Sequence, residues 1–308
     1  MLKRINPIQV RLGMFVEAID GEWIGQPFWR SRFLLDNVND VRSLKLSGVR
    51  SVTINTDAGV DTVNALSGKT RRIASSAKVT RALRTIEKSK PLIEAMFNDA
   101  RLGNGVPIGG ARQVVEQIAA CMTDSARALI EVTRLRRRDE YTFLHSIAVT
   151  ALMVHFGRSL KINEESIQTL AMGGLLHDIG KIKTPLYILN KTGSLSDEEM
   201  AKIREHPQHS FEILSRQGDM PEMVLDICRH HHERIDGRGY PQGLFGNQIS
   251  MPVRIASICD VYDALTSTRP YKKAWQPADA GKFMVQQEGQ FDHKLLKQFF
   301  FCLSRCDL

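Results

Sequence analysis

A histidine followed directly by an aspartate, at the end of an apolar run, is the feature that most constrains how this chain folds. The pair lies within residues 175–181, which read Leu-Leu-His-Asp-Ile-Gly-Lys. Adjacent positions on a helix are about 100° apart, so His177 and Asp178 cannot hold one metal from one helix face. A carboxylate has two oxygens, however, and can bridge two cations whose other ligands come from elsewhere. The segment therefore predicts a two-metal site, with Gly180 ending or bending its helix.

Further candidate ligands lie on separate segments before and after this one. They are His145, His206, the run His230-His231-His232-Glu233, and Asp260. Imidazole and carboxylate groups together suit iron, manganese, nickel or zinc, and the set contains no thiolate, which argues against a structural zinc site. The sequence therefore offers enough ligands for two divalent metal ions, with iron or manganese preferred and nickel or zinc as alternatives.

Five short motifs follow one another along the second half of the chain. They occupy residues 177–181, 231–233, 236–241, 260–264 and 269–271, and read His-Asp-Ile-Gly-Lys, His-His-Glu, Asp-Gly-Arg-Gly-Tyr-Pro, Asp-Val-Tyr-Asp-Ala and Arg-Pro-Tyr. Together they resemble the HD-GYP family of bacterial cyclic di-GMP phosphodiesterases. The resemblance runs from about residue 139 to about residue 300, roughly half of the chain.

The resemblance implies a role for each residue that matches the family pattern. Metal ligation falls to His145, His177, Asp178, His206, His231, His232 and Asp260. Catalysis involves Asp178 and Lys181, and substrate binding involves Lys181, Arg269, Lys272 and Tyr240. Apart from the resemblance, Lys181 could cap the C-terminus of a helix, and Arg269 and Lys272 could be surface charges. His155, His209, His230 and His293 match no ligand position.

The implied chemistry is hydrolysis of a phosphodiester by a metal-activated hydroxide. Two cations about 3.5–4 Å apart, bridged by Asp178 and a water, would lower the pKa of that water from 15.7 towards about 7. The hydroxide would attack phosphorus in line, so no serine or cysteine nucleophile is required. The resemblance thus implies hydrolysis of cyclic di-GMP to linear pGpG, and it leaves open further cleavage to GMP.

One position departs from the family pattern and leaves the substrate open. Some members have a glutamate one helical turn before the first histidine that helps to hold a third metal, whereas this chain has Tyr141 there. A neutral phenol is a poor ligand, so we expect two metals. The alternatives are a 3'3'-cyclic GMP-AMP phosphodiesterase, a catalytically weak receptor for a cyclic dinucleotide, and a hydrolase of mononucleotides. The intact ligand set favours an enzyme over a receptor.

The catalytic domain, residues 139–308, is expected to be all-α, so that the fold is mainly α. Helical patterns cover residues 167–178, 197–215, 220–232 and 251–267. Ser196 and Glu199 have the spacing of a capping box at the start of the second of these helices.

Residues 1–65 differ from the rest and predict a small α+β module. Short β-type runs at 14–19, 28–35 and 49–55 are bounded by Gly, Asp and Asn, and residues 38–46 have helical spacing. Residues 12–16 and 27–33 resemble the N-terminal domain of unknown function that precedes some HD-GYP domains. Trp23 and Trp29 could bind a ligand, although packing within the module is the simpler role.

Residues 66–138 are expected to form a linker and connecting helices. The helical patterns cover about 75–98 and 111–136, and the glycine-rich residues 103–110 interrupt them. These helices could connect the two domains or pair across a homodimer, and the sequence does not decide between these roles.

Charge and composition limit the classes of partner. The net charge of +8 suits an anionic ligand such as a cyclic dinucleotide. The densest basic run, residues 134–138, has no interleaved aromatic residue, so we expect no DNA or RNA polymer. The sequence contains no run of about 18 apolar residues, so it predicts no membrane span. The five cysteines form no C-x-x-C pair, which is typical of a reducing cytoplasm. The loop 236–241 is a candidate contact for the substrate, or for a diguanylate cyclase (GGDEF) or other signalling protein.

Overall fold

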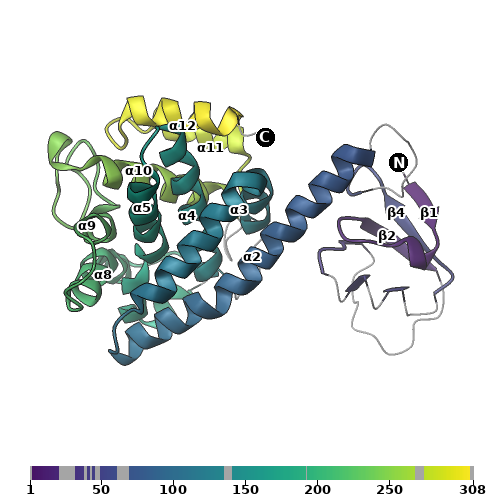
Figure 1. Ribbon diagram of the computed structural model, residues 1–308, viewed down its shortest axis with the longest axis horizontal. Helices are drawn as coiled ribbons and strands as arrows, with labels where there is room; N and C mark the ends of the chain where they lie inside the picture. The colour runs from purple at the N-terminus through teal and green to yellow at the C-terminus, as the bar shows by residue number, and fades with distance from the viewer. Residues whose placement is uncertain are drawn as a thin grey trace. The chain divides into compact units, whose positions relative to one another are not determined.

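The computed structural model divides into two units, Met1–Arg72 and Ile73–Leu308 (Figure 1). Each unit has its own apolar core. The described residues are 2–20, 32–37, 40–41, 44–45, 49–60, 69–134, 141–191, 193–267 and 274–305. Side chains are described for the same residues except 69–76 and 141–142. The predicted Trp23 and Trp29, and most of the predicted motif 27–33, lie outside this set.

The first unit is built on a four-stranded antiparallel sheet with the order β1-β4-β2-β3. The strands are β1 (Leu2–Ile5), β2 (Phe15–Asp20), β3 (Phe33–Leu34) and β4 (Ser51–Asn55). Alternate residues such as Val16, Val52 and Ile54 are fully buried on one side of the sheet. Residues 40–41 and 44–45 are helical. The prediction of an α+β module is confirmed, and β1 is a strand that the sequence pattern did not reveal.

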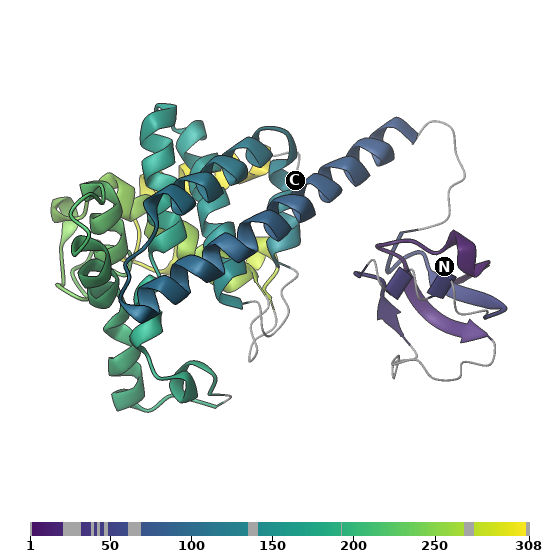
Figure 2. The ribbon, with the colours of Figure 1, turned by 60° about the horizontal axis from the view of Figure 1, so that its bottom comes forward.

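Two long helices begin the second unit. They are α2 (Lys69–Leu102) and α3 (Ile108–Arg134), which lie antiparallel and side by side (Figures 1 and 2). Ser89 donates a hydrogen bond to Gln117 across this pair, and Arg81 pairs with Asp124. Buried residues of both helices belong to the same apolar core as the helices that follow. The two helices are therefore part of the helical unit.

Helices α4 (Tyr141–Ser159) and α5 (Glu164–Leu176) pack against one another, and the remaining helices of the second unit follow them in the chain. They are α6 (Leu186–Leu189), α7 (Asp197–Arg204), α8 (His206–Ser215), α9 (Glu222–His230), α10 (Met251–Thr266), α11 (Pro277–Gln286) and α12 (His293–Arg305), with short 3-10 turns η3 (Ile179–Lys183) and η4 (Gly246–Gln248). A Cβ on Gly173 would lie 2.5 Å from Ile227 of α9, and one on Gly174 would lie 2.5 Å from Met153 of α4. These glycines let α5 lie close to both neighbours, so its C-terminal end sits in the middle of the unit.

The predicted helices are present, although their boundaries differ by a few residues, and two of the differences affect the site. The helix expected over 167–178 is α5, which ends at Leu176, so His177 and Asp178 lie just beyond it. The helix expected over 197–215 is divided at Glu205 into α7 and α8. The capping box of Ser196 and Glu199 is confirmed. Among the described helices, none has the length and apolar character needed to cross a bilayer. The mainly α fold class is also confirmed.

Candidate metal centre

The centre is built around Asp178, which lies in the turn between α5 and η3. His177 is the C-terminal cap of α5, and Asp178 has φ −97° and ψ 7°, outside the regular helix. Because the backbone turns here, the two adjacent side chains reach the same place, with His177 Nε2 3.4 Å from Asp178 Oδ2. Both side chains are buried. The end of the helix therefore brings together two side chains that a continuous helix would separate.

Gly180 holds this turn against α8. Its backbone N–H donates to Ser210 Oγ at 2.9 Å, and the same hydroxyl donates to the carbonyl of His177 at 2.8 Å. A Cβ at position 180 would lie 2.0 Å from the carbonyl oxygen of His206. Only glycine permits this approach, so Gly180 fixes the distance between His177 and the helix that begins with His206.

Four imidazoles surround the Asp178 carboxylate. Oδ1 is 3.2 Å from His206 Nε2 and 4.0 Å from His231 Nε2. Oδ2 is 3.4 Å from His177 Nε2 and 3.5 Å from His145 Nε2. The two oxygens of one carboxylate thus face two different pairs of histidines.

A second carboxylate, Asp260 of α10, completes the cluster. Its Oδ1 lies 3.1 Å from His145 Nε2 and 3.9 Å from His177 Nε2, and its Oδ2 lies 3.9 Å from His232 Nδ1. The structure therefore brings together all seven residues that the sequence predicts as metal ligands, from α4, α8, α10 and the segments that follow α5 and α9. We call these seven residues the His/Asp cluster.

Acceptors behind the rings orient four of the five histidines. Nδ1 of His177 faces the carbonyl of Gly174 at 2.9 Å, and Nδ1 of His206 faces that of Ile203 at 2.6 Å. Nδ1 of His231 is 3.1 Å from the carbonyl of Cys228. His145 differs, because its Nδ1 is 2.6 Å from the Asp263 carboxylate. A proton on each Nδ1 leaves Nε2 as the free lone pair, the arrangement typical of a metal-binding imidazole.

The charges of the cluster favour cation binding. Burial alone would raise the pKa of Asp178, but His177 and Lys181 hold this pKa well below its usual range. Burial lowers the pKa of His206 and His231, and it lowers the pKa of His232 to about 3. His177 is the exception: burial acts to lower its pKa, but the adjacent Asp178 raises it. At neutral pH three imidazoles are thus neutral and Asp178 is ionised, as ligands must be.

Two polar atoms in the cluster indicate that a cation fits there. Among the described residues, His177 Nε2 and Asp178 Oδ1 are buried without a hydrogen-bond partner. Buried polar atoms of this kind are costly unless another group satisfies them. Ligand atoms within 4.8 Å of one another occur in three overlapping sets: His206, His231 and His232; His145, His177 and Asp260; and His177, Asp178 and His231. The donor set suits divalent transition metals.

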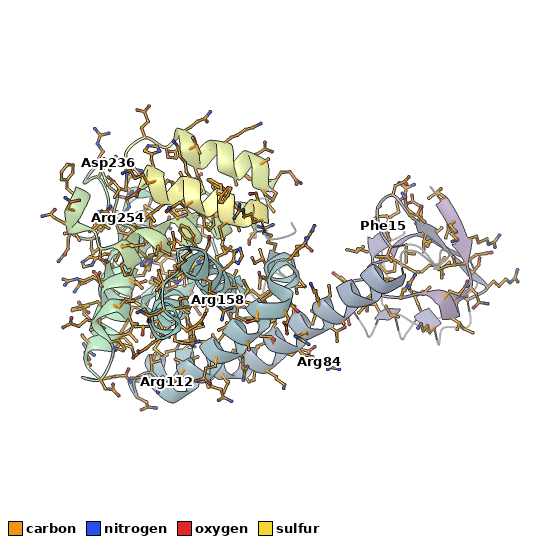
Figure 3. All side chains as sticks on the ribbon, turned by 45° about the horizontal axis from the view of Figure 1, so that its top comes forward. Phe15, Arg84, Arg112, Arg158, Asp236 and Arg254 are labelled. Atoms are coloured by element: carbon orange, nitrogen blue, oxygen red, sulfur yellow. The ribbon has the colours of Figure 1, made fainter. Side chains whose placement is uncertain are left out.

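The loop after α9 covers one side of the cluster. Glu233 is buried, and its carboxylate accepts the backbone N–H groups of Gln242, Gly243 and Leu244 at 2.7 to 3.1 Å. The Glu233 carboxylate thus holds the backbone of this loop, which is a structural role. Tyr240 stacks on His232, with ring centroids 4.8 Å apart. Figure 3 labels Asp236 of this loop and Arg254 of α10, both in the second unit.

The predicted phosphate-binding residues are only partly described. Lys181 Nζ lies 2.5 Å from Asp178 Oδ2. Arg269, Lys272 and the side chain of Tyr141 lie outside the described residues. No role was predicted from the sequence for Asp263 or Ser210, although Asp263 is three residues after Asp260 on the same helix. That spacing was the available signal, because residues three apart share one face of a helix.

Two family models together match nearly the whole chain. The HD domain matches residues 114–295, and a domain of unknown function, DUF3391, matches residues 2–111. The chain is 40% identical to the cyclic di-GMP phosphodiesterase PA4108 of Pseudomonas aeruginosa, over 97% of this chain and 76% of that protein.

More distant similarity extends to other proteins. The cyclic di-GMP phosphodiesterase response regulator RpfG of Xanthomonas campestris is 38% identical over 52% of this chain and 43% of its own length. The 3'3'-cGAMP-specific phosphodiesterase 1 of Vibrio cholerae is 39% identical over 47% of this chain and 33% of its own.

A solved structure has the same fold along the whole chain. The structure of Bd1817 from Bdellovibrio bacteriovorus, described as an HDG"Y"P protein, superposes with a TM-score of 0.62 and covers 99% of this chain and 100% of its own, at 18% identity. Given the two family matches, the long alignment with PA4108 and the HD motif in its buried cluster, the chain belongs to the HD-GYP family of HD-domain proteins and carries an N-terminal DUF3391 domain.

Proposed function

We propose that the protein is a metal-dependent phosphodiesterase that hydrolyses cyclic di-GMP to linear pGpG. The observation that carries this proposal is the His/Asp cluster, in which five imidazoles and two carboxylates converge in the interior of the helical unit. The substrate follows from the relatives, since PA4108 and RpfG are both named cyclic di-GMP phosphodiesterases.

We assign two divalent cations to the cluster, iron or manganese, with Asp178 bridging them. The Oδ1 side of Asp178 offers His206, His231 and His232, and the Oδ2 side offers His145, His177 and Asp260. Such a pair of cations lowers the pKa of a coordinated water and stabilises charge on phosphoryl oxygens. The division into two sets of three, with one shared carboxylate, supports two ions per chain.

Basic side chains next to the cluster would hold the phosphates. Lys181 is half-buried beside Asp178 and places a positive charge at the edge of the cluster. A cavity of about 350 Å³, which we call the arginine cavity, is lined by His232, Tyr240, Arg204 and Arg238, among others. Arg204 lies over the ring of Tyr240, 5.5 Å from its centroid. Burial raises the pKa of Tyr240, so its phenol stays neutral and can donate a hydrogen bond to a phosphate oxygen.

We also propose Arg269 and Lys272 as phosphate contacts, on the family resemblance alone. The loop that contains Tyr240 is also a candidate surface for a GGDEF protein. Its backbone is tied to the buried Glu233, so a partner would meet a preformed loop.

A second candidate substrate is 3'3'-cyclic GMP-AMP. The similarity to the 3'3'-cGAMP-specific phosphodiesterase of Vibrio cholerae favours it, as does Tyr141 at the position where some family members have a glutamate. Both candidates contain the same bridging phosphodiester, so the cluster would act on either one in the same way.

The test combines metal analysis with substrate competition. Protein purified anaerobically and loaded with iron(II) or manganese should contain two metal ions per chain. It should consume cyclic di-GMP faster than cyclic GMP-AMP and release pGpG, as followed by chromatography. His293→Ala, at an exposed histidine of α12, is the matched control and should behave like the wild type. If both nucleotides bind the metal-loaded protein but stay intact, the protein is a receptor and the proposed enzyme activity is wrong.

A further inference from the structure

Lys181 also lines a second and larger cavity, which the proposed reaction leaves without a role. This cavity, which we call the α2 cavity, has a volume of about 570 Å³ and lies between helix α2 and the chain that follows the His/Asp cluster. A volume of a few hundred cubic ångströms is typical of small-molecule sites in proteins. Residues 93–101 of α2 form one wall, and residues 181–189 form another.

The α2 cavity combines aromatic faces with polar groups of both charges. Phe97 of α2 and Phe143 of α4 line it together with aliphatic residues such as Ile93 and Ile182. The polar lining comes from Glu94, Asn98 and Arg101 on α2 and from Lys181. Thr184, also in the lining, is buried, and the described part of the chain offers its hydroxyl no hydrogen-bond partner.

The α2 cavity adjoins the proposed reaction centre through Lys181. This residue lines the cavity, and its Nζ lies 2.5 Å from Asp178 Oδ2. A ligand in the cavity would therefore lie beside Lys181, which pairs with the carboxylate at the centre of the His/Asp cluster.

We propose that the α2 cavity is the subsite for a guanine base of the substrate. The inference rests on the proposed function and names which part of the cyclic dinucleotide each group recognises. A base stacks on aromatic rings. The rings of Phe97 and Phe143 line the cavity, and Lys90 Nζ lies over the Phe143 ring, 5.0 Å from its centroid, so Phe97 is the ring that we assign to stacking. Arginine pairs with guanine O6 and N7, as Arg101 could do here. The N1–H and N2–H groups of guanine need an acceptor, and the Glu94 carboxylate is the acidic group of the described lining.

Helix α2 thereby gains a role in specificity. Adenine has no N1–H and carries an amino group in place of O6, so both Glu94 and Arg101 discriminate against it. Glu94 has an exposed contact with Lys90 at 3.9 Å, which is too weak to compete with a base. The cavity should therefore favour a guanine-containing dinucleotide over cyclic di-AMP.

The test compares substrates in variants of α2. Arg101→Gln and Glu94→Gln should each lower kcat/KM for cyclic di-GMP about tenfold, which is the effect of losing about 1.4 kcal/mol of binding. They should lower it much less for bis(p-nitrophenyl) phosphate, which has no base to place in the cavity. The ratio of kcat/KM for cyclic di-GMP over cyclic di-AMP should fall in both variants. Arg84→Gln and Glu87→Gln are matched controls at exposed positions of the same helix, outside the cavity lining (Figure 3 labels Arg84).

Two results would overturn the guanine subsite while leaving the phosphodiesterase intact. One is an unchanged kcat/KM for cyclic di-GMP in both variants, and the other is an equal loss on all three diesters. If the wild-type protein cleaves no diester, the proposed function fails on its own. Calorimetric binding of cyclic di-GMP then decides the inference: a tenfold weaker affinity in Arg101→Gln supports the subsite, and an equal affinity rejects it.

Discussion

Asp263 Oδ2 lies 2.6 Å from Nδ1 of His145, at the edge of the imidazole ring opposite to the nitrogen that faces Asp178 and Asp260. Asp263 is buried, and its other oxygen accepts a hydrogen bond from Ser267. A carboxylate behind an imidazole fixes the tautomer and makes the free nitrogen more basic. Asp263 therefore acts as a positioning residue for His145.

Replacing Asp263 with asparagine should weaken metal binding. The amide keeps the shape of the carboxylate but loses its charge, so Asp263→Asn should lower metal affinity by about 10-fold to 100-fold. Metal titration of the chelated protein measures this affinity directly. Activity should recover at higher metal concentration, which a purely structural defect would not allow. The control is Asp279→Asn, at an exposed position in the first turn of α11.

Replacing Gly180 with alanine should displace the turn that carries Asp178. The added Cβ would lie 2.0 Å from the His206 carbonyl and 2.5 Å from the Ser210 backbone nitrogen. Backbone atoms cannot move aside as a flexible side chain can, so we expect a loss of at least about 1–3 kcal/mol in the free energy of unfolding, together with lower metal content. Gly193→Ala is the control, since its Cβ would have no neighbour within 4 Å. Equal urea stability of the two variants would contradict this account of Gly180.

The composition of the cluster could be predicted from sequence because five of its seven residues belong to the short motifs, and His145 and His206 match the same family pattern. The geometry of the cluster could not be predicted in this way. The link between Gly180 and Ser210 joins residues 30 apart, and the link between His145 and Asp263 joins residues 118 apart. Such contacts depend on how helices pack, and local patterns carry no information about them. Gly180 was expected to end or bend the helix, whereas α5 already ends at Leu176 and the glycine serves close packing.

In the N-terminal unit, too, local sequence patterns predicted some elements but not an element that depends on long-range pairing. Runs of β-type residues bounded by Gly, Asp and Asn, at 14–19 and 49–55, predicted β2 and β4. Strand β1 reads Leu-Lys-Arg-Ile and has little apolar character of its own. It is a strand because Leu2–Ile5 pairs with β4, in a register that only the folded sheet defines. Tertiary pairing therefore outweighs the local propensity of these residues.

Replacing Glu233 with glutamine should loosen the loop that holds Tyr240 against His232. The carboxylate accepts three backbone N–H groups, and the NH₂ of glutamine would face one of these donors instead. We expect Glu233→Gln to lose about 1–3 kcal/mol of stability and to raise KM for the substrate, while metal content stays at the wild-type level. Glu222→Gln, at an exposed site in the first turn of α9, is the control. Loss of metal from Glu233→Gln would show instead that Glu233 is a ligand.

Removing either member of the adjacent pair should abolish turnover. His177→Ala and Asp178→Ala each delete a group that contacts several others in the cluster. Asp178→Ala should cost both metal ions, because it removes the proposed bridge, whereas His177→Ala should weaken the side with His145 and Asp260 more. Metal analysis and a cyclic di-GMP assay measure these effects. Full activity in either variant would place the reaction centre elsewhere.

The lowered pKa values of the buried histidines predict how stability depends on pH once metal is removed by chelation. His206, His231 and His232 bind protons less readily when folded than at their ordinary pKa of 6.5. These neutral histidines contribute fully to the free energy of unfolding above pH 6.5, and this contribution is lost as the pH falls. For His232 the loss continues down to about pH 3. His177, whose pKa is raised, acts in the opposite direction, but it is one group against three.

Urea unfolding of the chelated protein tests this balance. Between pH 7 and pH 5, His232 alone should lower the free energy of unfolding by about 2 kcal/mol, because protonation then favours the unfolded chain. His232→Gln should show a smaller fall, since glutamine does not titrate. Asp178 and Asp260 do not contribute in this range, because their pKa values are lowered from 3.8 and their effect begins only at more acidic pH. A free energy of unfolding that rises towards pH 5 would mean that the cluster holds protons in place of metal.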